Sequence, residues 1–118
     1  MNKYSNETEE QIAVVQYCDL RGILCVHVPN EGKRSKAYGA KLQQMGMRKG
    51  FPDLLILEAR GGFHGLAIEM KYGKGTASEA QKLWLELLRM KGYACAVCYG
   101  FEAARAAIDA YMIGDDKK

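Results

Sequence analysis

The chain has 118 residues, of which 48% are hydrophobic and 26% are charged, with 17 Lys and Arg against 14 Asp and Glu. These values are typical of a folded globular protein and argue against intrinsic disorder. The length suits one domain, expected over residues 1–118 with a core at about 7–113. No apolar run approaches the roughly 20 residues that cross a bilayer, and the N-terminus has no signal-peptide pattern, so we expect a cytoplasmic protein without a membrane partner.

The first predicted helix runs from Glu7 to Arg21. Acidic residues fill its first turn, where the helix dipole favours them, and Gly22 ends it. Apolar residues at helical spacing form its expected inner face: Ile12, Val15 and Cys18. A β-branched strand is expected over 23–28, before Pro29, and a helix over 35–47.

Strands and helices alternate in the second half of the chain. Strands are expected at 53–58 and 64–71, joined by a Gly61-Gly62 turn. A helix over 78–91, a strand over 93–99 and a helix over 101–113 follow. Hairpin strands combined with helical crossovers predict an α/β fold, in which a mixed central β-sheet is flanked by helices.

Cysteines and histidines give no convincing metal site. Disulfides are not expected without a secretory signal. Cys95 and Cys98 have CxxC spacing but lie in a predicted strand, where residues three apart point to opposite faces. The cysteines are therefore interpreted as small buried residues, and His27 and His64 as packing or surface residues.

Two acidic residues are expected to face each other across the predicted hairpin. Asp53 opens its first strand, and Glu69 lies near the end of its second. The Gly61-Gly62 turn pairs them directly or nearly so, with Cβ atoms about 5 Å apart, although a register change of one residue would weaken this. Because like charges repel, a divalent cation, Mg²⁺ or Mn²⁺, is the expected occupant.

Lys71 stands two residues after Glu69 and shares its face of the strand. Beside a carboxylate-bound cation, a lysine can orient or deprotonate a water or hold a phosphate oxygen. The carbonyl of Met70 is a candidate third ligand. The alternative interpretation is that Asp53 and Glu69 are polar edge residues and Lys71 their counter-ion.

A basic segment without a single acid precedes the acidic pair, and it contains Lys33, Arg34, Lys36, Lys41, Arg48 and Lys49. Phosphate contacts with DNA are the expected role, although a charge run is often only a solvated surface. Lys74 lies in a basic turn that lacks the pattern of a phosphate-binding loop. Tyr4, Tyr38 and Tyr72 could stack on bases, but nothing in the sequence favours this over surface positions.

Two segments resemble the PD-(D/E)xK nuclease superfamily: Gly-Phe-Pro-Asp-Leu at 50–54 and Ile-Glu-Met-Lys at 68–71. More narrowly, the chain resembles the VRR-NUC (virus-type replication-repair nuclease) domain in its small, stand-alone phage form. Further matches are the acidic, glutamine-bearing start of the first helix, the Pro-Asn-Glu-Gly-Lys-Arg step at 29–34, and the Ser-x-x-Gln-x-x-Trp helix at 78–84. The similarity covers residues 7–99.

The resemblance implies a restriction-endonuclease-like core and metal-dependent hydrolysis of DNA phosphodiester bonds, without an organic cofactor. Asp53 and Glu69 would bind the metal with the Met70 carbonyl, and Lys71 would position or activate the attacking water.

Two further site residues are implied by the same resemblance. Glu10 of the first helix would complete the site, with Glu7 as the alternative one turn earlier. Gln81 would contact the water or a phosphate, unless it is only a solvated amide on a helix face.

Stand-alone members of the family imply a homodimer that cuts branched DNA such as Holliday junctions, encoded by a phage or prophage and acting in the cytoplasm of a bacterial host. A two-fold enzyme suits two symmetric cuts. The alternatives are a nuclease of the same fold that acts on flaps, ends or nicked duplex, a DNA-binding module that does not cut, and a small scaffold whose acidic pair is fortuitous. The intact set of Asp53, Glu69 and Lys71 favours an enzyme.

Overall fold

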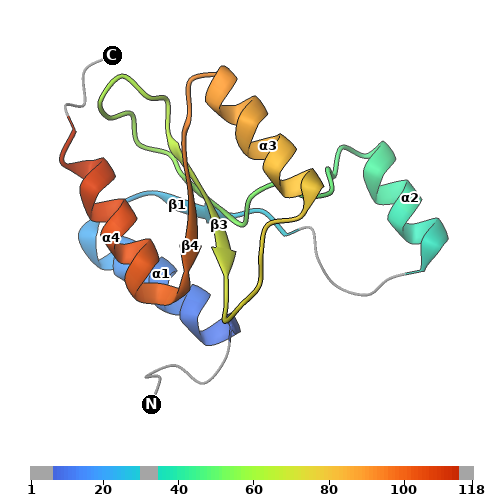
Figure 1. The fold of residues 1–118 in the computed structure, drawn as a ribbon, viewed down its shortest axis with the longest axis horizontal. Coiled ribbons are helices and arrows are strands. Elements are labelled where there is room, and N and C mark those ends of the chain that lie inside the picture. The colour runs from blue at the N-terminus through green and yellow to red at the C-terminus, as the bar shows by residue number, and fades with distance from the viewer. Residues whose placement is uncertain (1–6, 30–34, 115–118) are drawn as a thin grey trace.

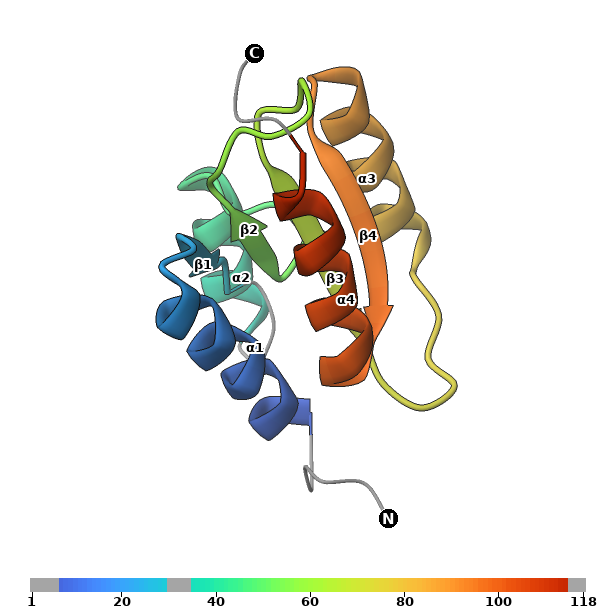
Figure 2. The same ribbon diagram turned by 90° about the vertical axis from the view of Figure 1, so that its left-hand side faces the viewer.

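The computed structural model describes residues 7–29 and 35–114. These residues form a four-stranded sheet with helices on both faces (Figures 1 and 2). In chain order the elements are α1 (Glu7–Arg21), β1 (Cys25–His27), α2 (Lys36–Gln44), β2 (Leu54–Ile56), β3 (Leu66–Lys71), α3 (Glu79–Met90), β4 (Ala94–Tyr99) and α4 (Gly100–Met112). The predicted α/β fold with a mixed sheet is confirmed.

The sheet has the strand order β1-β2-β3-β4. β1, β2 and β3 are antiparallel neighbours. β4 is parallel to β3, because α3 returns the chain to the edge of the sheet at which β3 begins. Leu54 pairs with Ile68. The next residues outward, Asp53 and Glu69, therefore fall at opposite positions, and the predicted register of the hairpin is confirmed.

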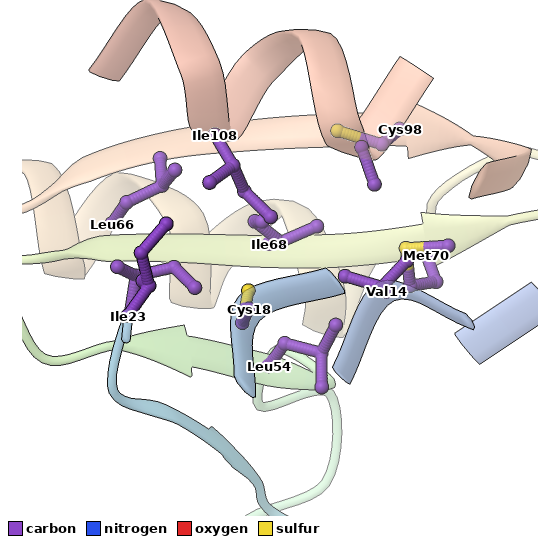
Figure 3. Packing of buried hydrophobic residues seen from close by; sticks show 11 residues of the cluster. Val14, Cys18, Ile23, Leu54, Leu66, Ile68, Met70, Cys98 and Ile108 are labelled. Carbon is purple, nitrogen blue, oxygen red and sulfur yellow. The ribbon is translucent and has the colours of Figure 1, made fainter. Parts of the chain in front are cut away.

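The hydrophobic core lies between the sheet and the helices α1 and α4. Figure 3 shows Val14 and Cys18 of α1 and Ile108 of α4 packed with Leu54 and Ile68 of the sheet. All five side chains are fully buried. Each large aliphatic side chain buried in this way contributes about 1.5–3 kcal/mol, so this layer fixes α1 and α4 against one face of the sheet.

The inner face of α1 differs from the prediction. Cys18 is buried as expected, but Ala13 and Val14 accompany it, and Ile12 is 49% exposed. Val15 packs only partly against the core. The buried face of α1 is rotated relative to the predicted one, because Val14 and Cys18, one helical turn apart, contact both the sheet and α4. The spacing of apolar residues alone does not determine which face of the helix is buried.

The opposite face of the sheet is covered by α3. The Cys95 thiol donates to the carbonyl of Leu85 in α3 at 3.5 Å, whereas Cys98 is buried in the core on the other side. The prediction that these two cysteines face opposite sides is confirmed. No helix among the residues that the structure describes is both long and apolar enough to cross a membrane.

Several elements are shorter than predicted. β1 and β2 have three residues each, and α2 ends at Gln44, shortly before Gly46 with its φ of +114°. The hydroxyl of Ser35 accepts from the backbone N–H of Tyr38 at 3.1 Å and so begins α2. No residue of α2 is buried, and the helix stands away from the sheet in Figure 1.

Candidate functional site

Asp53 and Glu69 are the only buried charged side chains among residues 7–29 and 35–114, at 8% and 3% exposure. The Asp53 carboxylate reaches across the hairpin, where its Oδ2 accepts from the backbone N–H of Met70 at 2.7 Å. The strand pairing that the Gly61-Gly62 turn sets up therefore holds two carboxylates together inside the protein.

Lys71 and Gln81 surround one oxygen of Glu69. The Gln81 amide donates from Nε2 to Glu69 Oε2 at 3.0 Å, and Lys71 Nζ lies 3.5 Å from the same oxygen. Lys71 Nζ also donates to Gln81 Oε1 at 2.7 Å, which closes a triangle of three side chains. The predicted proximity of Lys71 to Glu69 is thus present, and Gln81 joins them.

Gln81 is held in place by the start of α3. Its backbone N–H donates to the Ser78 hydroxyl at 3.2 Å, and its Oε1 accepts from the backbone N–H of Ser78 at 2.8 Å. This reciprocal capping box satisfies N–H groups that a helix start leaves unpaired. The same side chain therefore begins α3 and orients Lys71 and Glu69.

The other oxygen of Glu69 has no such partner. Within the described chain, Glu69 Oε1 is buried and makes no hydrogen bond. An unsatisfied buried acceptor costs about 1–3 kcal/mol, and more when it is charged. Burial raises the pKa of Glu69, and the charge of Asp53 raises it further, to about 8, although Lys71 acts in the opposite direction.

A divalent cation fits this arrangement. It would neutralise the two carboxylates and give Glu69 Oε1 a partner, and hard cations prefer such oxygen ligands. No group of three or more His, Cys, Asp and Glu side chains that could hold a metal occurs in the described ranges. The two carboxylates would therefore need a backbone oxygen, such as the predicted Met70 carbonyl, and waters, which Mg²⁺ readily keeps.

A cavity of about 720 Å³ opens over the acidic pair. The start of α1 contributes Glu7 and Gln11 to its wall, and the segment before β2 contributes Lys49. The backbone of that segment crosses close to α3, because a Cβ at Gly50, where φ is +87°, would lie 2.7 Å from the backbone of Ala80. Glycine at this position lets the segment and the start of α3 meet at the cavity.

The structure places Glu10 outside this cavity, contrary to the predicted preference for Glu10 over Glu7. Glu10 Oε1 accepts from the backbone N–H of Phe101 at 2.8 Å and caps the start of α4. Tyr99, the N-cap residue itself, makes no side-chain cap. Glu7, one turn earlier on α1, is the glutamate that lines the cavity with Asp53 and Glu69.

Of the basic residues predicted to bind DNA, only some lie at the cavity in the part of the chain that the structure describes. Lys49 lines the cavity, whereas Lys36, Arg48 and Lys74 are exposed on surface segments. Arg48 also donates to the carbonyl oxygens of its own segment. Lys33 and Arg34 lie outside the described residues.

His27 is a cavity residue that the sequence did not reveal. Its Nδ1 lies 2.8 Å from the backbone carbonyl oxygen of Asp53, to which the Nδ1–H tautomer donates. The same oxygen accepts from the backbone N–H of Val28 at 3.0 Å. His27 thus helps to fix the backbone at Asp53, and its place depends on the pairing of β1 with β2, which residue spacing does not specify.

The fold and the acidic pair are those of a nuclease domain, and comparisons with known proteins identify its family. The VRR-NUC domain family matches residues 5–102. A solved structure described as a "VRR_NUC domain protein" is 32% identical with a TM-score of 0.82, covering 98% of this chain and 94% of that one. No curated protein matches the sequence. The chain belongs to the VRR-NUC family, which confirms the resemblance.

The raised pKa of Glu69 predicts a stability that depends on pH. Between the ordinary value of 4.5 and about 8, folded Glu69 keeps a proton that the unfolded chain releases. The free energy of unfolding, measured by urea titration in EDTA, should therefore fall as pH rises through this range. Glu69→Gln should remove that part of the slope, and Mg²⁺ or Mn²⁺ should stabilise the parental protein most at the upper end. An identical pH dependence of the parent and Glu69→Gln would contradict this assignment.

Proposed function

We propose that this nuclease domain is a Mg²⁺- or Mn²⁺-dependent endonuclease that hydrolyses DNA phosphodiester bonds, with a preference for branched DNA. Family membership supports nuclease activity. The observation that carries the metal dependence is the buried Asp53–Glu69 pair, in which one carboxylate oxygen has no hydrogen-bond partner among the described residues.

In this proposal Asp53, Glu69 and the Met70 carbonyl hold the cation. When bound, it supplies positive charge to the transition state and lowers the pKa of a bound water. Lys71 positions the attacking water or a phosphate oxygen, because its ammonium lies beside Glu69 at the cavity. Gln81 keeps Lys71 and Glu69 aligned through its two amide hydrogen bonds.

We further propose that Glu7, rather than Glu10, completes the site. Glu7 lines the same cavity as the acidic pair. Its carboxylate is thus available to accept a proton from the attacking water or to hold a water beside the cation. Glu10 is engaged in capping α4 and has a structural role.

The DNA backbone is proposed to follow the basic residues around the cavity. Lys49 is the first contact because it lines the cavity, and Lys36, Arg48 and Lys74 would extend the track, with Lys33 and Arg34 as further candidates. Selectivity for Holliday junctions, homodimerisation and a bacterial host rest on the resemblance to stand-alone phage-type members. A single domain over 1–118 and a cytoplasmic location rest on the chain length and on the lack of membrane and signal-peptide patterns. Action on flaps, ends or nicked duplex is the alternative, since it needs the same catalytic residues.

Cleavage assays on junction, flap, nicked and intact duplex DNA test the proposal. Cutting should need Mg²⁺ or Mn²⁺ and stop in EDTA. Asp53→Asn and Lys71→Ala should each lower the single-turnover rate at least about 100-fold while DNA binding survives, because both act on the reacting groups. An exposed lysine in α3, Lys82, provides the control, and Lys82→Ala should cut at the parental rate. Cleavage by Lys71→Ala at the parental rate would remove Lys71 from the mechanism, and no cleavage of any DNA with either metal would contradict the proposed function.

A matched pair of substitutions separates the two glutamates of α1. Glu10→Ala should lower the free energy of unfolding by about 1–2 kcal/mol, because it removes a charged cap from α4. Glu7→Ala should change stability by less than about 0.5 kcal/mol but lower the cleavage rate at least about tenfold. Urea titration and single-turnover cleavage measure the two effects. The assignment is reversed if the fully folded Glu10→Ala protein is the one that fails to cut.

A further inference from the structure

A second cavity, of about 260 Å³, adjoins the active-site cavity, and Tyr72 lines both. Tyr99 lines the second cavity as well. Tyr72 directly follows β3, and Tyr99 is the last residue of β4. The ends of these parallel strands lie at the same end of the molecule as the starts of α1 and α4 (Figures 1 and 2).

Tyr99 is a close neighbour of the catalytic lysine. Tyr99 and Lys71 are paired in the parallel register of β3 and β4, so their side chains share a face of the sheet on strands about 4.8 Å apart. Tyr99 is 48% exposed. A half-exposed tyrosine thus lines the second cavity on the strand next to the residue proposed to contact the scissile phosphate.

The charges around this second cavity select against phosphate. Glu10 and Glu102 both line it. The positive end of α4 is already neutralised, since the Phe101 N–H donates to Glu10. A DNA phosphate would be repelled here and attracted towards Lys71 in the adjoining active-site cavity. Beside Tyr99, an uncharged aromatic ring is the favoured occupant.

We propose that the second cavity binds one unpaired nucleobase, belonging to a nucleotide next to the scissile phosphate, by stacking on Tyr99. Stacking on aromatic side chains tolerates any base, because every base has a π-face. Taking a base out of intact duplex requires unstacking, which is easiest where the base is already unpaired. The inference rests on the proposed DNA cleavage and gives it a source of structure selectivity, since flaps, nicks and branch points supply such bases.

A cycle of protein and DNA changes tests the stacking. Binding of the full chain, in EDTA, is measured by fluorescence anisotropy on flap DNA that carries one unpaired nucleotide beside the cut, and on the same DNA with an abasic residue there. Tyr99→Ala should weaken binding to the base-bearing DNA about 5- to 150-fold and leave abasic DNA unaffected, whereas Tyr99→Phe should bind both like the parent. Phe63→Ala is the control, because Phe63 is a similarly exposed aromatic (44%) before the start of β3.

A spectroscopic measurement supplies a readout that a merely structural effect would not produce. With 2-aminopurine as the unpaired base, its fluorescence should be quenched on binding to the parent and to Tyr99→Phe, but not to Tyr99→Ala at saturation. Unchanged binding by Tyr99→Ala, an equal loss on base-bearing and abasic DNA, or the absence of quenching would each overturn the inference.

The inference and the proposed function fail in different ways. If metal-dependent cleavage is normal but the base makes no difference, only the nucleobase site is wrong. If no DNA of any structure is bound or cut, the proposed function fails and the inference fails with it.

Discussion

The cost of charging two carboxyl groups that are buried side by side is the constraint on which the rest of this structure depends. Asp53 and Glu69 are brought together by the pairing of β2 with β3, away from water that would screen their charges. Lys71 and Gln81 satisfy one oxygen of Glu69, and the backbone of β3 satisfies one oxygen of Asp53. The compensation is incomplete, and a bound divalent cation would offset the remaining cost.

The surrounding elements serve this pair in distinguishable ways. The capping box at the start of α3 holds the Gln81 side chain in place, and the same side chain amide accepts from Lys71. The start of α3 and the position of Lys71 therefore both depend on Gln81. β1 delivers His27 to the backbone of Asp53. Along α1, two glutamates one turn apart have different surroundings. Glu10 caps α4, whereas Glu7 lines the cavity over the acidic pair. The second cavity is formed partly by that cap, so the position of α4 links the proposed catalytic and nucleobase sites.

Much of this arrangement could be predicted from local sequence signals. A two-glycine turn and alternating strands were enough to place Asp53 opposite Glu69 and Lys71 beside it, since a hairpin fixes its own register. The choice between Glu7 and Glu10 could not be predicted, because it depends on a contact with a helix about 90 residues further along the chain. The same holds for His27, whose role follows from strand pairing, and for the inner face of α1, which two neighbouring elements determine together.

Anomalous X-ray diffraction from crystals grown with Mn²⁺ tests the cation site most directly. A bound Mn²⁺ is expected between the carboxylates of Asp53 and Glu69, with Glu69 Oε1 among its ligands and with the peak absent in Glu69→Gln. Unchanged carboxylate positions without an anomalous peak between them would contradict the interpretation of this pair as a metal-binding catalytic centre.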